Sequence, residues 1–60
     1  MTRNEAKQFI EAAIGYPVND MDDGGFHVRF DELDMLTDEQ WATVRVARND
    51  VTDKGVYFYA

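Results

Sequence analysis

No cysteine occurs in this chain of sixty residues, so the fold must hold without covalent cross-links. A disulfide framework, a thiolate zinc site and a thiol nucleophile are therefore excluded, although the first two commonly support domains this small. A chain of this length buries only about 60% of the surface that its unfolded form exposes, and such a core rarely supplies more than about 3 to 5 kcal/mol. We expect a single small domain over residues 1–60 that gains stability from a second subunit or another partner.

The composition favours a folded chain over a disordered acidic tail, because apolar residues make up 45% of it. The longest purely apolar run is the five residues from Val56 to Ala60, whereas a membrane helix needs about 20. The amino end also has no apolar centre of the kind that marks a signal peptide. These features predict a soluble, cytoplasmic protein.

The first segment has the pattern of an amphipathic helix over residues 3–14. Thr2 and Glu5 have the spacing of a capping box, and Gly15 with Pro17 supplies a stop. Apolar side chains recur every three or four residues, which places them on one face of a helix. These side chains are Ala6, Phe9, Ile10, Ala13 and Ile14.

Residues 16–25 are rich in Asp, Asn, Pro and Gly and are predicted to form a loop. The next residues alternate between apolar and polar types, which is typical of a strand with one buried face. The inward set is predicted to be Phe26, Val28 and Phe30, and the outward set His27, Arg29 and Asp31.

A second helix is predicted to start at Thr37, which can form a capping box with Gln40. Its continuation is ambiguous. Trp41, Val44, Ala47 and Val51 fall on one side of a helix, but Ala42 and Val46 project from nearly the opposite side. Residues 42–47 could instead be a strand with Ala42, Val44 and Val46 inward. We favour the helix because its start signals agree with one another.

Turn residues follow at Asn49-Asp50 and over residues 53–55, and the aromatic run from Val56 to Tyr59 predicts a terminal strand. The expected fold class is α+β, with the order helix, strand, helix, strand and a minimal sheet. Such a chain makes a right-handed crossover between two parallel strands. Because two strands form a poor sheet, a dimer could pair sheet edges. The alternative is one N-terminal helix packed on a three-stranded antiparallel sheet, with residues 42–47 as the extra strand.

Acidic residues are concentrated in the middle third of the chain. Residues 20–39 hold eight acids and one base, whereas the remainder holds four acids and five bases. The eight acids are Asp20, Asp22, Asp23, Asp31, Glu32, Asp34, Asp38 and Glu39. If they lie side by side, their field attracts a cationic partner. A simpler interpretation is that turns and helix starts favour Asp and that acidic surfaces keep small proteins soluble. Both interpretations remain open.

The functional interpretation favours a basic protein surface as the partner. Direct nucleic-acid binding is not expected, because phosphate recognition depends on clustered Lys and Arg and this chain has no such cluster. In size and charge alone, the chain resembles small acidic phage-type inhibitors and DNA mimics. That resemblance implies a non-enzymatic module that blocks a basic partner. The runner-up is a structural or self-assembling homodimer, in which Ala42 and Val46 add a second apolar patch.

The segment from Asp20 to Gly25 has some features of a calcium-binding EF-hand loop. Counted from Asp20, however, Gly24 occupies the third ligand position and Asp31, a shorter acid than the usual Glu, occupies the last. A strand also follows in place of a helix. We predict an ordinary acidic turn and no metal site or cofactor.

His27 is the one histidine and the natural candidate for a general base. Its place in the alternating pattern puts it on the outer face of a strand, and no Ser or Cys is present to act as a nucleophile. Gly24 and Gly25 precede a strand and not a helix, so they do not form a phosphate-binding loop. We therefore expect no enzymatic activity.

Large aromatic side chains complete the predicted binding surface. Trp41, Tyr57 and Tyr59 could anchor a partner, and the tyrosines should lie on the strand face opposite Val56 and Phe58. The competing interpretation is that a small core uses aromatics for buried area.

Overall fold

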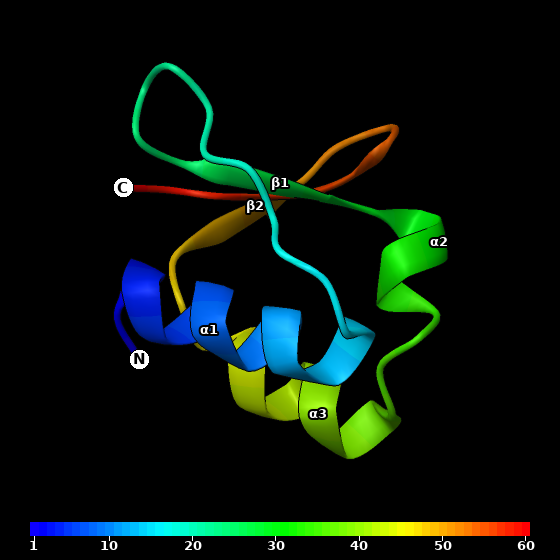
Figure 1. Ribbon diagram of the computed structural model, residues 1–60. Coiled ribbons are helices and arrows are strands. Elements are labelled where there is room, and N and C mark those ends of the chain that lie inside the picture. Colours follow the sequence, from blue (N-terminus) through cyan, green and yellow to red (C-terminus); the bar gives the residue numbers. More distant parts are fainter.

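The computed structural model describes all residues from 1 to 60 and has the α+β architecture predicted from the sequence. A three-stranded sheet forms one layer, and two helices form the other, below the sheet in Figure 1. The elements in chain order are α1 (Arg3–Ile14), β1 (Phe26–Arg29), α2 (Phe30–Leu33), α3 (Asp38–Val44), β2 (Asn49–Val51) and β3 (Gly55–Phe58). No helix is both long and apolar enough to cross a membrane.

The sheet has the strand order β1-β3-β2, and both pairs are antiparallel. The predicted parallel crossover between the first and last strands is therefore wrong. The third strand of the alternative topology is present, but residues 49–51 form it and residues 42–47 do not. The Thr52 hydroxyl accepts N–H groups from Lys54 (3.2 Å) and Gly55 (3.1 Å). This moves the hairpin turn beyond Asn49-Asp50, which were predicted to be a turn and instead begin β2.

Both long helices start at the predicted capping boxes. Thr2 and Glu5 cap α1, and Thr37 and Gln40 cap α3. Gly15 ends α1 with a φ of 87° and donates its N–H to the Glu11 carbonyl, a backbone conformation that favours glycine. The helical interpretation of the second segment is thus confirmed, although α3 ends at Val44.

Only one of the two apolar sides noted in the sequence faces the core. Val44 and Ala47 are buried, whereas Ala42 is exposed and Val46 is 68% exposed. The chain leaves the helix at Arg45, and Asn49 then donates side-chain hydrogen bonds back to the Arg45 and Ala47 carbonyls at 2.8 and 2.6 Å. The segment after α3 is thereby fixed to the start of β2.

The core lies between the sheet and the two helices. The Phe26 and Phe58 rings stack across β1 and β3 with centroids 4.8 Å apart, and both are fully buried. The predicted alternation in the last strand is confirmed, because Val56 and Phe58 are buried whereas Tyr57 and Tyr59 face the other side. The remaining core residues are Ala6, Ile10, Ile14, Val18, Val28, Val44 and Ala47.

Phe30 is the exception to the predicted inward set, since it is 45% exposed and begins α2. The Glu32 carboxylate accepts the Arg29 N–H at 3.0 Å. Capping of this kind favours a helical turn over continued extension. The strand therefore ends at Arg29, and Phe30 leaves the face that Phe26 and Val28 share.

Gly55 sits where β3 passes closest to β1, and we predict that it tolerates no side chain. A Cβ atom there would collide with the Val28 carbonyl oxygen and lie 2.8 Å from the Arg29 Cα. Gly55→Ala should therefore lower the free energy of unfolding by about 3 kcal/mol in urea denaturation. Gly15→Ala is the control, because its Cβ would meet nothing within 4 Å and only the left-handed backbone would cost about 1 kcal/mol. Equal losses in the two variants would contradict this account.

Candidate partner-binding surface

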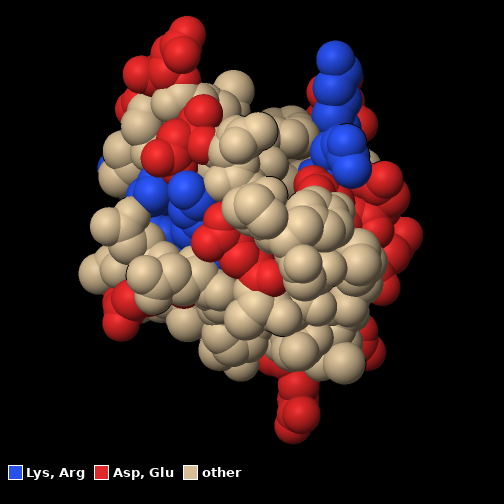
Figure 2. Space-filling view, viewed as in Figure 1, with Lys and Arg blue, Asp and Glu red and all other residues tan.

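The structure divides the acids of residues 20–39 into two groups. Asp20, Asp22 and Asp23 lie in the loop before β1, and the other five lie in α2, in α3 and between them. The four residues of β1 separate the groups, which corresponds to about 13 Å of extended chain. Figure 2 shows acidic side chains on several sides of the molecule and not in one continuous patch. The single electronegative surface that the functional interpretation required is not formed.

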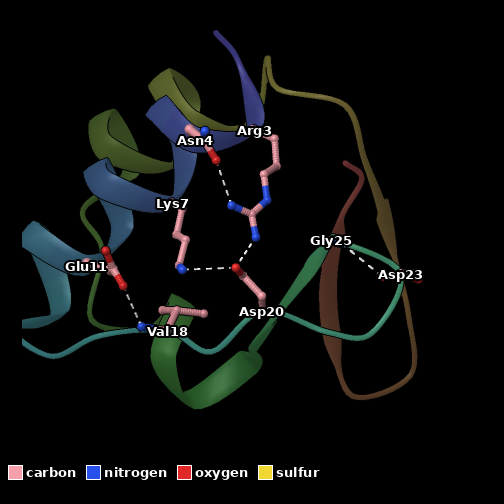
Figure 3. Close-up of polar contacts among 8 residues, drawn as sticks. All are labelled: Arg3, Asn4, Lys7, Glu11, Val18, Asp20, Asp23 and Gly25. Carbon is pink, nitrogen blue, oxygen red and sulfur yellow. Dashed lines mark hydrogen bonds and ion pairs between the residues drawn. The ribbon is translucent and has the colours of Figure 1, made fainter.

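In the first group, Asp20 is paired with basic residues of α1. Asp20 pairs with Arg3 and with Lys7, whose Nζ lies 2.9 Å from Oδ1 (Figure 3). Hydrogen bonds from Lys7 and then Arg3 lower the pKa of Asp20. The Glu11 carboxylate of α1 accepts the Val18 N–H at 2.7 Å. The loop is thus held to α1 by a carboxylate of the helix and by one of its own, Asp20. Asp20 therefore holds the loop in place and does not present a free charge.

Asp23 is engaged by the sheet. The Tyr57 hydroxyl donates to Oδ2 at 2.5 Å, and the Gly25 N–H donates to Oδ1 at 3.0 Å. These two hydrogen bonds lower the pKa of Asp23, and the bond to Asp23 raises the pKa of Tyr57 to about 12. Asp22 makes no ion pair. No three His, Asp or Glu side chains converge as metal ligands.

Tyr57 and Tyr59 lie on the sheet face that no helix covers, but their hydroxyls are already bonded. The two rings meet edge to face at 4.9 Å. Tyr59 donates to Asp50, and the Arg48 guanidinium lies 4.7 Å from the centre of its ring. The structure therefore separates these tyrosines from Trp41, which belongs to α3 on the other face.

His27 lies on the same outer face, as the alternation predicted. It is opposite Tyr57 in the register, and its Nε2 is 3.0 Å from the Thr52 hydroxyl. This contact connects β1 to the hairpin turn. The same hydroxyl also accepts the N–H groups of Lys54 and Gly55, so it is held in the turn, and no carboxylate is bonded to the imidazole.

Two acids of the second group also have structural partners. Glu32 is only 8% exposed and accepts the Tyr16 hydroxyl at 2.7 Å in addition to the Arg29 N–H. Asp31 lies 3.1 Å from the Arg29 Nε. Asp31 and then Glu32 raise the pKa of Arg29. Glu32, predicted as a partner-binding residue, is therefore a buried anchor for α2.

Asp34, Asp38 and Glu39 remain without an ion pair, and two of them line an apolar groove. Asp34 and Asp38 lie at the groove with Thr37, and its volume is about 420 Å³. Asp38 and Glu39 also occupy the first turn of α3, where the helix dipole stabilises negative charge. The apolar lining consists of Phe30, Leu33, Leu36, Trp41, Val51 and Val56.

The groove brings some of the predicted site residues together and adds others. Trp41 lines it with Asp34 and Asp38, as a predicted anchor beside predicted acids. Phe30 and Val51 were not predicted for this role. Phe30 was assigned to the core side of a strand, and Val51 to the buried side of a helix. The sequence signal for this turn is Glu32, three residues after Arg29, which is half of a capping box; Arg29 is not a capping residue, so the alternation was the stronger pattern.

No protein-family model, no curated protein and no solved structure matches this chain. The roles of its residues therefore rest on their own geometry.

The bond between Tyr57 and Asp23 predicts an unusually late tyrosine titration. The phenolate of Tyr57 should form at about pH 12. Because this pKa is raised in the folded state, the bond's contribution to stability is fully present below the ordinary tyrosine value of 10.0 and is lost as pH rises through about 12.

Ring signals of Tyr57 in an NMR titration would measure this shift. Asp23→Asn should lower the pKa of Tyr57, and Asp22→Asn, which removes the same charge from the neighbouring residue, should leave it almost unchanged. A Tyr57 that titrates identically in both variants would show that the bond to Asp23 is not its cause.

Proposed function

We propose that this chain is a non-enzymatic protein-binding module that recognises a basic, partly apolar segment of another protein through the groove between α2, α3 and β2. The observation that carries the proposal is the combination of Trp41 with the unpaired carboxylates Asp34 and Asp38 around one apolar cavity. The eight acids of the middle segment do not act together in this proposal. Only those without an internal partner contribute charge to recognition.

The apolar part of the groove provides the binding energy. Phe30 is 45% exposed and Val51 is 70% exposed, so a partner that covers them removes apolar surface from water. Such burial contributes about 25 cal/mol for each Å². Tryptophan side chains in partly enclosed pockets are also frequent energetic centres of interfaces. The half-buried Trp41 fits this role.

The charged part of the groove determines which partner binds. Asp34, Asp38 and Glu39 make no ion pair, and the whole chain has a net charge of -6. A basic segment would be steered to this side and oriented there, whereas an acidic segment would be repelled. Two copies of this chain would bring their own acidic rims together. The charge therefore favours a different, basic protein over self-assembly.

The proposal extends to inhibition of proteins that bind nucleic acids. Their binding surfaces combine Lys and Arg with apolar and aromatic residues, which is the chemistry that this groove accepts. Occupation of such a surface would exclude nucleic acid, as expected for an acidic inhibitor of the phage or mobile-element type. The cytoplasm is the proposed setting, since a chain without cysteine draws no support from an oxidising compartment.

A defined peptide tests the proposal. The probe is a heptapeptide of alternating Lys and Val, blocked at both ends, and its binding is followed by the fluorescence of Trp41, the one tryptophan in the chain. We expect Asp34→Asn and Asp38→Asn together to weaken binding about tenfold, since the attraction between an exposed carboxylate and a nearby basic partner contributes up to about 1 kcal/mol. Binding should also weaken as salt concentration rises.

Single substitutions provide the matched controls. Asp34→Asn and Asp38→Asn should each weaken binding about threefold, whereas Asp22→Asn, which removes one charge from the distant loop, should have little effect. Equal losses in all three would mean that only net charge matters. An unchanged Trp41 fluorescence with the Lys-Val peptide, or an equal response to a Glu-Val peptide, would overturn the proposed function.

A further inference from the structure

The outer edge of β2 is not paired with any other strand. Tyr59 donates its N–H to the Arg48 carbonyl at 3.1 Å, and Thr52 donates to the Gly55 carbonyl at 2.7 Å. Bonded and non-bonded residues alternate along an antiparallel ladder. Asp50, midway between Arg48 and Thr52, therefore also turns its backbone groups toward β3.

By the same alternation, Asn49 and Val51 turn their backbone N–H and C=O groups away from β3. Because no strand lies on that side of β2, the register leaves both N–H groups without a strand partner. Val51 is 70% exposed and also lines the groove. The open backbone edge and the apolar cavity are thus continuous at one residue.

The other edge of the sheet is less accessible. Asp20 forms a bridge to Phe26 at the outer side of β1, and α2 follows β1 directly. Proteins usually protect exposed edges with Lys, Pro or a bulge. β2 consists of Asn49, Asp50 and Val51 and has none of these; its shortness and the charge of Asp50 are its only protection, and they favour a basic partner over an uncharged or acidic one.

We infer that the basic segment recognised by the groove binds as an extended strand, added antiparallel to β2 as the fourth strand of the sheet. This inference rests on the proposed function and specifies its binding mode. Strand addition would satisfy the free groups of Asn49 and Val51 with backbone hydrogen bonds. An added helix could bury apolar side chains in the groove but would leave those groups without partners.

The pleat of the added strand specifies the partner's sequence pattern. Val51 pairs with the buried Val56 and lies on the inner face, whereas Asp50 pairs with Tyr57 and lies on the outer face. A strand about 4.8 Å from β2 would place every second side chain beside Val51, over the groove. Its other side chains would lie on the outer face beside Asp50. Asp34 and Asp38 at the groove would therefore attract the basic residues through the field of the acidic rim and not through direct ion pairs. The matching partner therefore alternates apolar and basic residues.

A second copy of this chain fits the edge less well. Two β2 strands centred on each other would place Asp50 opposite Asp50, and like charges directly opposite are destabilising. Each copy also carries a net charge of -6. We therefore assign the edge to a basic segment of a different protein.

Backbone methylation of the Lys-Val heptapeptide tests the inference. The peptide residues directly opposite Asn49 and Val51 would exchange backbone hydrogen bonds with them, as in any bonded antiparallel pair. Their side chains would lie on the inner face of the sheet with Val51, so these peptide residues should be Val. N-methylation of the Val amides should weaken binding at least about tenfold. N-methylation of the Lys amides, which point away from β2, should weaken it less than about threefold.

A variant of the chain tests the same contact from the other side. Val51→Pro removes the outward N–H without removing a bond to β3, a substitution that edge strands tolerate. It should abolish peptide binding. Val51→Ala keeps the N–H and should weaken binding only about threefold. Circular dichroism would check that both variants fold. In the wild-type complex, the amides of Asn49 and Val51 should also exchange with solvent at least about tenfold more slowly.

The outcomes separate the two proposals. If both methylated peptides bind like the parent and Trp41 still responds, the groove binds its partner but strand addition is overturned. If the parent peptide gives no Trp41 response, both proposals fail. If sedimentation shows a dimer without peptide and the same two amides are already protected, a second copy occupies the edge and the inference is overturned.

Discussion

The hydrogen bond from the Arg29 N–H to Glu32 determines the shape of the surface on which function is proposed. It ends β1 and starts α2, so the next apolar residue leaves the core. The same carboxylate accepts the Tyr16 hydroxyl from the loop after α1. Because Glu32 is almost fully buried, its carboxylate would be poorly satisfied without these two donors, which is costly inside a protein. One side chain thus fixes α2 and exposes Phe30 at the groove.

The acidic residues have two different roles in this fold. Asp20 and Glu32 connect segments that are distant in the sequence, Asp20 through the bases of α1 and Glu32 through Tyr16. Such carboxylates contribute to structure and offer little net field to a partner. Asp34, Asp38 and Glu39 make no ion pair, so their charge is available. A count of acids in the sequence therefore overstates the functional charge.

Much of the fold was predictable because its signals are local. The capping boxes at Thr2 and Thr37 and the alternation around Phe58 depend on neighbouring residues, and each is confirmed. The third strand was not predictable in this way. β2 has three residues of which two favour turns, and its stability comes from pairing with β3, a contact that the sequence does not display.

The candidate site was predictable in its residue types but not in its grouping. Trp41 and the acids of residues 34–39 were selected, yet the tyrosines selected with them lie across the sheet. Which carboxylates remain free depends on where Arg3, Lys7 and Arg29 fall in space. The end of β1 shows a related conflict, since alternation placed Phe30 inward while the Glu32 cap turned the chain. A buried hydrogen bond decided between two reasonable local patterns.

The coincidence of a groove, an open edge and free carboxylates follows from the size of the domain. A sixty-residue chain has too little material to cover every face of its sheet, and α3, with seven residues, leaves Val51 exposed beside Trp41. A fourth strand from a partner would cover both side chains and complete the layer. Because such a partner binds only the folded chain, its binding would also stabilise the fold by mass action. Recognition and stability would then depend on the same buried contacts.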